Sequence, residues 1–224
     1  MSFVKLNEMG EFFYKVKRKL RKIYRRLVFG ELTPYEMQKR KKQEDYDYLK
    51  SHGVDTEYGY VTLHGKPIIH KEPGSVIRMG KDVVLTSDSE VNTAGINHPV
   101  IIATYSKDAE VVLEDNVGMS GVSINCVSRC VFKKGVMLGA NVNVWDTDFH
   151  PVVPQQRLCQ TSILDAKTAP ITLEKNVWIG ANTTILKGVT IGENTVVGAM
   201  SLVNRDLPSN SLCVGNPAQT VKDL

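Results

Sequence analysis

The sequence predicts an all-β protein, a parallel β-helix, that is preceded by a basic α-helical segment. Aliphatic residues recur at every sixth position in the C-terminal third of the chain, and glycine and asparagine recur between them. Lys and Arg, in contrast, are concentrated in the first 42 residues. We therefore expect the basic helical segment in residues 1–60 and the β-helix in residues 61–224.

The six-residue period is clearest in residues 171–206, which read "ITLEKNVWIGANTTILKGVTIGENTVVGAMSLVNRD". An α-helix spaces its apolar residues three and four apart and a half-buried strand alternates them, so neither produces a period of six. A short fixed period is typical of a parallel β-helix, in which each block supplies a strand and a turn. The third residue of each block is aliphatic and is expected to point inward: Leu173, Ile179, Ile185, Ile191, Val197 and Val203.

Glycine and asparagine between these aliphatic residues are expected to form the corners of the coil. Both residue types tolerate the positive φ angles that tight turns require. The expected corner residues are Gly180, Asn182, Gly188, Gly192, Asn194 and Gly198.

The six-residue spacing continues upstream with interruptions. It is kept by Met79 and Leu85, by Leu113 and Met119, and by Phe132, Leu138 and Val144. Val144 and Leu173 are 29 residues apart, which is four blocks and five extra residues. We therefore expect the chain to leave the coil in a loop from Asp146 to about Thr168.

This loop opens with "WDTDFHP", which places Asp146 and Asp148 close before His150. Residues two apart in an extended segment share one face, so the three side chains could point the same way. Histidine titrates near neutrality and is the commonest general base, and a carboxylate can hold its ring in the working orientation. The residues alone are equally compatible with a solvated surface loop.

The repeats, together with "WDTDFHPV", "NVWIGANTTILKGVTIGENTVVGAMSLVNRDLP" and "GNPAQTVK", resemble the hexapeptide-repeat acyltransferases. The most similar subgroups are the galactoside and maltose O-acetyltransferases and the surface-polysaccharide O-acetyltransferases, and the resemblance covers roughly residues 70–224. It implies a left-handed β-helix and a homotrimer with active sites between subunits. It also implies transfer of an acetyl group from acetyl-CoA to a saccharide hydroxyl, with His150 as the general base.

The resemblance also suggests the binding residues. On the acceptor side, Asp146 or Asp148 orients His150 or binds the sugar, and Ser120 stands where galactoside-type enzymes carry an asparagine. His98, in "GINHP", could reach the acceptor groove or be structural. The donor residues implied for acetyl-CoA are Trp178, Ala181, Ala199, Asn204, Arg205, Gln219 and Lys222. The family often has arginine at the position of Gln219, so we expect a weaker phosphate contact there.

The sequence is also compatible with other functions. An amino sugar could replace the hydroxyl acceptor, which would make the protein an N-acetyltransferase. A zinc-dependent hydratase on the same fold needs three histidine ligands, but only His98 and His150 lie well inside the repeats, so we expect no metal. A non-catalytic trimeric scaffold would not need the His150 cluster, and a covalent route through Cys159 has no paired base. The four cysteines form no C-x-x-C pair.

The N-terminal segment carries most of the positive charge. Residues 1–42 contain 13 Lys/Arg and 4 Asp/Glu, and residues 43–224 contain 15 and 20. Residues 11–29 place five apolar residues on one helical face, namely Phe13, Val16, Leu20, Ile23 and Leu27. We weigh two roles for this helix, peripheral contact with an anionic membrane and packing on the trimer. The net negative charge of residues 43–224 disfavours nucleic acid as a partner. The lack of a signal peptide predicts a cytoplasmic protein.

Overall fold

The computed structural model describes residues 14–21, 23–24, 30 and 32–224. By its contacts the chain divides into two units, residues 1–41 and residues 42–224. Residues 42–60, which we expected in the N-terminal segment, belong by these contacts to the unit that contains the β-helix.

The N-terminal unit is helical where it is described. Residues 14–21 and 23–24 are helical, as expected for the basic segment, and Val16, Leu20 and Ile23 are exposed. Phe13 and Leu27, the ends of the expected apolar stripe, lie outside the described residues. No helix in the described ranges has the length and apolar content needed to cross a membrane.

Helix α2 (Pro34–Ser51) begins with a reciprocal cap. The Thr33 hydroxyl accepts from the backbone N–H of Glu36, and the Glu36 carboxylate accepts from the N–H of Thr33. The C-terminal half of α2 packs against the start of the coil, where Leu49 is fully buried and the Asp45 carboxylate accepts from the N–H of Leu63. This packing covers the first coil of the β-helix.

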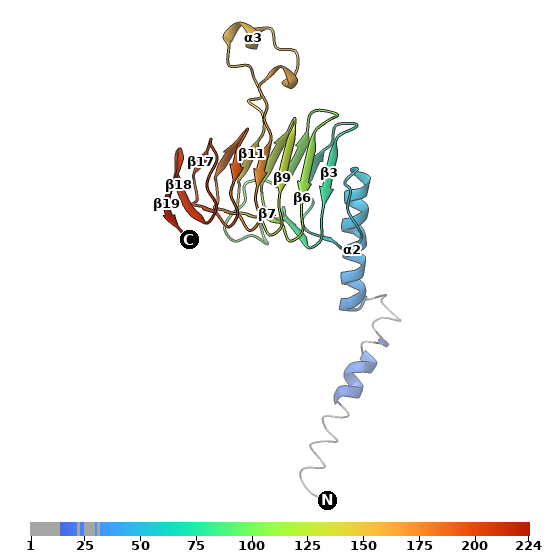
Figure 1. Cartoon of the computed structure of the whole chain (residues 1–224). Coiled ribbons are helices and arrows are strands. Elements are labelled where there is room, and N and C mark those ends of the chain that lie inside the picture. The colour runs from blue at the N-terminus through green and yellow to red at the C-terminus, as the bar shows by residue number, and fades with distance from the viewer. Residues whose placement is uncertain (1–13, 22, 25–29, 31) are drawn as a thin grey trace, which may run out of the picture. The chain divides into compact units, whose positions relative to one another are not determined.

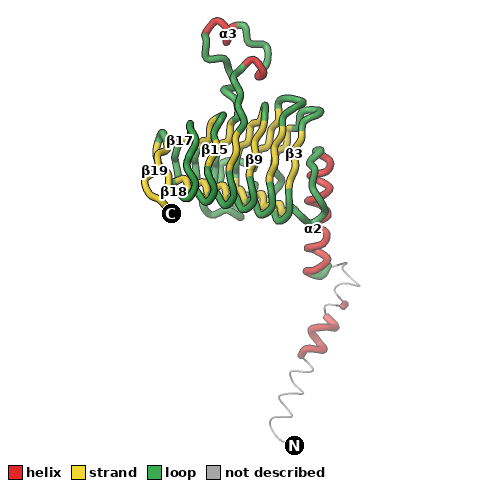
Figure 2. The backbone as a smooth tube through the Cα atoms, in the orientation of Figure 1, coloured by secondary structure: helices red, strands yellow, loops and turns green. Residues whose placement is uncertain are grey.

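The second unit is a left-handed parallel β-helix with three flat faces (Figures 1 and 2). Each face is one sheet, and we name it by its first strand. The β1 face contains, in order, β1 (Val61–His64), β4 (Val83–Thr86), β7 (Gly118–Ser120), β10 (Met137–Leu138), β13 (Trp178–Ile179), β16 (Val196–Val197), β18 (Ser211–Gly215) and β19 (Ala218–Asp223). The β2 face contains β2 (Ile68–His70), β5 (Ile101–Thr104), β8 (Ser123–Cys126), β11 (Asn143–Trp145), β14 (Thr184–Leu186) and β17 (Leu202–Val203). The β3 face contains β3 (Val76–Met79), β6 (Glu110–Leu113), β9 (Arg129–Phe132), β12 (Ile171–Leu173) and β15 (Thr190–Ile191).

Strands three apart in sequence pair in parallel within each face, except that β16 pairs in parallel with β18, and β19 runs antiparallel to β18. The six aliphatic residues of the repeat stack in this register and are all fully buried, which confirms the prediction from the six-residue period. The upstream residues with the same spacing are also buried. Burial of each such side chain stabilises the fold by roughly 1.5–3 kcal/mol.

The corner residues fall into two groups. Asn182, Gly188 and Asn194 have φ angles of 57°, 78° and 60°, as predicted. The prediction of positive φ is wrong for Gly180, Gly192 and Gly198. A Cβ atom at these three positions would come within 2.4–2.6 Å of an atom in the following part of the coil, so glycine is needed there for close approach of the chain.

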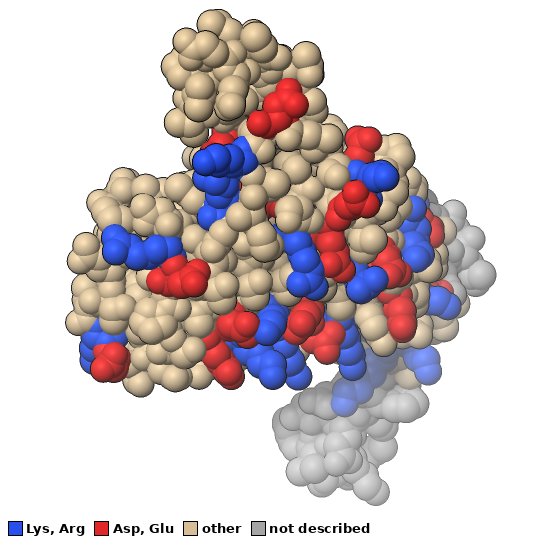
Figure 3. All heavy atoms as spheres, turned by 45° about the horizontal axis from the view of Figure 1, so that its top comes forward, with Lys and Arg blue, Asp and Glu red and all other residues tan. Residues whose placement is uncertain are grey.

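The three faces differ in charge. The strands of the β2 face and those of the β1 face from β1 to β18 contain no Asp, Glu, Lys or Arg. The β3 face instead carries Arg78, Glu110 and Arg129, which are linked by ion pairs between successive coils. Figure 3 shows basic and acidic side chains interspersed over the surface that it presents. Charge is therefore concentrated on the β3 face, while the β2 face and the β1 face up to β18 are uncharged in their strands.

Replacing Gly192 with alanine should destabilise the fold strongly. The added Cβ would lie 2.4 Å from the backbone nitrogen of Ser209, and overpacking of this kind costs about 1–3 kcal/mol. Gly118→Ala is the matched control, because nothing lies within 4 Å of a Cβ at that position. Thermal unfolding should show a clearly lower Tm for the first variant and little change for the second; equal Tm values would contradict the close-approach explanation.

Candidate active site

As predicted, the chain leaves the coil in a loop of residues 146–168, and it does so at the edge between the β2 and β3 faces. Its neck is closed by antiparallel contacts, with Asp148 N–H donating to the Lys167 carbonyl and Ala169 N–H donating to the Asp146 carbonyl. The loop contains α3 (Pro154–Leu158) and a short 3-10 turn, Ile163–Asp165, and it stands out from the coil in Figure 1. The strands on either side of it remain paired in the regular register.

His150 lies at the start of this loop and is exposed. Its Nδ1 atom lies 2.7 Å from Oε1 of Gln160, and Gln160 Nε2 donates to the carbonyls of Phe149 and Ser162 at 2.8 and 2.9 Å. Phe149 has a φ of 60°, a left-handed conformation that bulky residues rarely adopt. Its ring packs edge-on against Trp145, with centroids 5.8 Å apart, and this contact helps to hold the turn that presents His150.

Asp146 does not face His150, contrary to our expectation. The Asp146 side chain is fully buried and accepts from the backbone N–H groups of Val127, Ser128 and Arg129 at 2.7–3.0 Å. Burial raises the pKa of this carboxyl above its ordinary value, and the N–H donors partly oppose the rise. Asp146 therefore ties the base of the loop to the corner of the preceding coil, and the alternating-face argument fails because the segment turns after Asp146 to form the neck.

Asp148 also has a different partner from the one we expected. Its carboxylate forms a 2.6 Å ion pair with Lys187, which lies on the next coil, and both side chains are about a quarter exposed. The pair fixes the neck of the loop to the coil below it. Gln160 alone among the described side chains is hydrogen-bonded to the His150 ring.

A hollow of about 730 Å³ lies beside His150. Its walls are formed by Tyr105, Phe149, His150, Arg157, Gln160, Thr161, Ser162 and Ile163. Arg157 donates to the carbonyls of Pro151 and Val152, and Tyr105 donates to the Asn125 side chain. Burial raises the pKa of Tyr105 above its ordinary value. Arg157 is the one charged side chain among the wall residues.

A smaller hollow, of about 300 Å³, lies on the β1 face. Ser120 and Trp178 both line it, together with Met137 and Gly118. A Cβ at Gly118 would meet nothing within 4 Å, so the glycine leaves this surface open. Trp178 is 51% exposed, which is unusual for so large an apolar side chain and suits a surface that another molecule covers.

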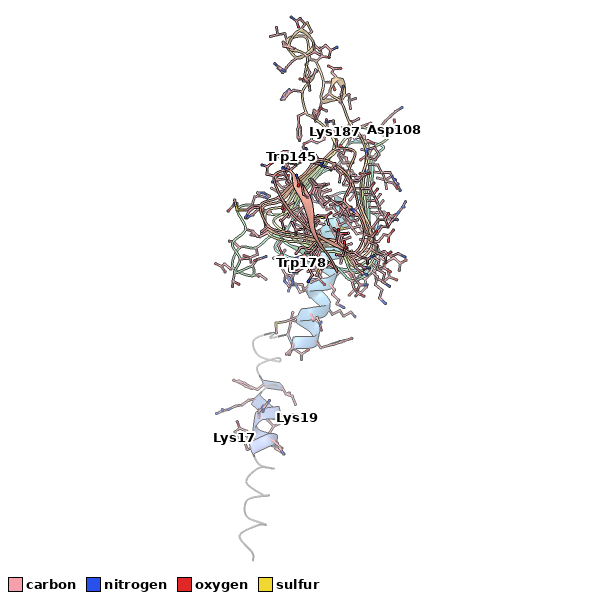
Figure 4. The ribbon with its side chains drawn as sticks, turned by 60° about the vertical axis from the view of Figure 1, so that its left-hand side comes forward. Lys17, Lys19, Asp108, Trp145, Trp178 and Lys187 are labelled. Atoms are coloured by element: carbon pink, nitrogen blue, oxygen red, sulfur yellow. The ribbon has the colours of Figure 1, made fainter. Side chains whose placement is uncertain are left out.

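The predicted site residues therefore do not come together in the single chain. Ser120 and Trp178 lie on the β1 face, and Ala181 and Ala199 follow at its edge with the β2 face. His150 lies at the opposite edge of the β2 face. Asn204 and Arg205, both exposed, follow β17 at that same edge, whereas Gln219 and Lys222 are exposed on β19. In Figure 4, Trp145 of the β2 face and Trp178 of the β1 face lie on different sides of the coil.

Two further candidates were His98 for the acceptor groove and a metal site. His98 Nδ1 contacts the carbonyl of Pro99 at 2.8 Å. The metal-competent group found among the described residues consists of Cys126, Cys130 and Asp146, not of histidines. Its Asp146 oxygens are already held by backbone N–H groups, and a hydrogen bond with Cys126 and burial raise the pKa of Cys130, which keeps that thiol protonated.

The repeats of this chain are similar to those of known proteins. Residues 170–205 match the family model described as bacterial transferase hexapeptide (six repeats). The chain resembles the hexapeptide-repeat acyltransferases. Galactoside O-acetyltransferase of Lactococcus lactis is 39% identical over 89 residues, which is 40% of this chain and 41% of that enzyme. The chain thus spans about two fifths of the length of the curated relatives it matches.

The fold is also seen in a solved structure. The N-acyltransferase AntD of Bacillus cereus, in complex with dTDP and 3-hydroxybutyryl-CoA, superposes with a TM-score of 0.60 over 80% of this chain and 87% of that one. The sequence identity is 21%, so the similarity is one of fold. It supports the β-helix architecture alone.

Replacing Asp146 with asparagine should destabilise the protein, because the amide NH₂ cannot accept from three backbone N–H groups. We expect a loss of about 1–3 kcal/mol, the cost of leaving buried donors unpaired. Asp148→Asn should cost less than about 1 kcal/mol, since its ion pair is partly exposed. Chemical denaturation of the two variants checks the difference, and equal losses would contradict the structural role of Asp146.

Proposed function

We propose that the protein is a CoA-dependent O-acetyltransferase that moves an acetyl group from acetyl-CoA to a hydroxyl of a saccharide, a surface-polysaccharide precursor. The observation that carries the proposal is the position of His150. One of its ring nitrogens is hydrogen-bonded to Gln160, and no described residue is hydrogen-bonded to the other. The ring lies at the wall of a hollow large enough for a sugar. The similarity to a galactoside O-acetyltransferase supports the choice of a sugar hydroxyl.

In the proposed mechanism His150 acts as a general base. A sugar hydroxyl is a weak nucleophile at neutral pH, so its proton must leave as the oxygen attacks the thioester carbonyl. The imidazole takes that proton while the new C–O bond forms. When the C–S bond breaks, the imidazolium returns the proton to the departing thiolate, so the products are the acetyl ester and free CoA.

We propose that the active protein is a homotrimer. Apart from Lys222 and Asp223 on β19, the strands of the β1 and β2 faces carry no charged residue, and Trp178, Met137 and Ile68 are 39–53% exposed there. A three-fold assembly in which the β2 face of one subunit meets the β1 face of the next covers both uncharged faces and leaves the charged β3 face in water. The loop of residues 146–168 also has exposed apolar side chains, namely Val152, Val153, Leu158 and Leu164.

This arrangement also explains why the predicted site is divided. The loop with His150 leaves the coil at one edge of the β2 face, so in the proposed trimer it reaches the β1 face of the neighbouring subunit. There it would lie beside the hollow lined by Ser120 and Trp178. We propose that Ser120 contacts the acceptor there and that the pantetheine arm of acetyl-CoA lies along Trp178. Ala181 and Ala199 flank that face with small side chains. Asn204, Arg205, Gln219 and Lys222 are exposed near the C-terminal coils and are our candidates for nucleotide contacts.

An amino sugar is the second candidate acceptor. The same base could take a proton from an attacking amine, and the fold carries N-acylation in AntD. A panel of sugars and amino sugars assayed by thiol release from acetyl-CoA separates the two acceptors, and absence of acetyl-CoA turnover with every member counts against the proposed activity.

His150→Ala should lower kcat by about 100-fold or more, the usual contribution of a general base. Acetyl-CoA affinity should change little, because the proposed donor contacts lie on other residues. Steady-state kinetics and calorimetric titration with CoA check both parts. Near-normal turnover of this variant would show that His150 is not the base.

The oligomeric state is tested by light scattering. We expect a mass of three chains for the full-length protein. Trp178→Lys, which places a charge on an uncharged face, should weaken the trimer, whereas Arg129→Lys on the charged β3 face should not. A stable monomer with full activity would refute the shared site.

We further propose that the protein is cytoplasmic and touches the membrane through residues 11–29. Residues 1–32 carry nine Lys/Arg and three Asp/Glu, and each basic residue near an anionic surface contributes about 1 kcal/mol. A lipid-linked saccharide would place the acceptor at that surface.

Deleting residues 1–32 keeps the cap of α2 and tests this role. The truncated protein should stay an active trimer on small free acceptors but lose sedimentation with anionic vesicles at low salt. If the segment instead packs on the trimer, deletion should cause aggregation or a lower Tm. Full-length protein that does not bind such vesicles contradicts the membrane role.

A further inference from the structure

Gln160 holds the His150 ring, and its own orientation is set by the backbone. Its Nε2 atom lies within hydrogen-bond distance of two carbonyl oxygens, those of Phe149 and Ser162. A carbonyl oxygen can only accept, so the NH₂ end of the amide must face these two groups. The amide oxygen, Oε1, is thereby turned toward His150, and the opposite amide orientation would place an oxygen against two oxygens.

This orientation determines where the His150 ring carries its proton. Oε1 is an acceptor, so the Nδ1 atom 2.7 Å away must be the donor. Neutral imidazole has one N–H, which leaves the Nε2 atom with a free lone pair. The described structure assigns no contact to that second nitrogen, so it can receive a proton from a molecule in the hollow.

The carbonyl of Ser162 is itself held in place. The Asp165 carboxylate accepts from the backbone N–H groups of Thr161 and Ser162, and these hydrogen bonds lower the pKa of Asp165. The same carboxylate closes the reciprocal cap of the 3-10 turn. A continuous set of contacts therefore runs from Asp165 through the 161–162 backbone and Gln160 to the ring of His150.

We propose that Gln160 is the positioning residue of this enzyme, which fixes His150 in the Nδ1–H tautomer and so makes Nε2 the atom that accepts the proton. The proposal rests on the function proposed above and adds to it the reacting atom and the residue that selects it. A neutral amide replaces the carboxylate that orients histidine in many triads. It can orient the ring, but it adds no negative charge to stabilise the imidazolium, so the proton is more readily passed on to the leaving thiolate.

The charged residues of the His150 loop are Asp146, Asp148, Arg157, Asp165 and Lys167. Arg157 lies in the wall of the same hollow, and Asp148, two residues before His150, is paired with Lys187. Asp165 is engaged with the loop backbone. The acidic groups near the ring thus already have partners, so a carboxylate introduced at position 160 would be a new charge beside His150.

Three variants separate positioning from folding. In Gln160→Leu the ring loses its acceptor, and kcat should fall by roughly 10- to 100-fold as the base is misplaced. In Gln160→Glu the carboxylate can still accept from Nδ1–H, so more activity should remain. The acid limb of its kcat/KM profile should move to higher pH by about one unit, because a neighbouring negative charge favours the imidazolium.

The matched control is Gln156→Leu. Gln156 is an exposed glutamine of α3, and its replacement should leave activity and pH profile unchanged.

Nitrogen NMR of the histidine rings gives a readout that needs no turnover. The His150 signals are identified by their loss in His150→Ala, and the neutral ring of the wild-type trimer should show Nδ1–H. Gln160→Leu should shift the ring toward Nε2–H or a mixture. A wild-type Nε2–H ring, an unchanged tautomer in Gln160→Leu, or an unshifted acid limb in Gln160→Glu each overturns the proposal. These results are independent of the turnover of His150→Ala, which tests the proposed function itself.

Discussion

The parallel pairing of each strand with the strand one coil away is the constraint on which the rest of this structure depends. Pairing fixes the spacing between coils, and it places each inward aliphatic residue over its equivalent, as Val144 lies over Ile185. The same spacing brings the corners so close together that Gly180 and Gly192 tolerate no side chain. Core packing, corner composition and the position of every outward side chain thus follow from one repeated set of backbone hydrogen bonds.

The sequence predicted this scaffold well because each coil obeys the same rule. A period of six in aliphatic residues was sufficient to locate the inward positions, and all six were buried. It was less informative about the corners, because a glycine required for positive φ and a glycine required for close approach look alike in sequence. Gly188 is the first kind and Gly192 the second. Only the position of the neighbouring coil distinguishes them.

The candidate site was less predictable because it lies where the repeat is absent. His150 could be found from its motif, but its neighbour Gln160 is ten residues away in a loop with no period, and no pattern links the two. Asp146 and Asp148 were misassigned for the same reason. Their partners, the 127–129 backbone and Lys187, belong to coils that are distant in sequence and adjacent in space. A carboxylate beside a histidine in sequence need not contact it.

The narrow neck of the 146–168 loop also determines how this protein can change. Thr147 and Thr168 pair across the neck, and the strands on both sides keep their register. The strand pairing of the coil therefore does not depend on the residues beyond that pair. Closing a loop of twice the length would cost only about 0.6 kcal/mol more. New recognition surfaces could arise there by insertion or exchange, while the paired coils that position the loop remain the same.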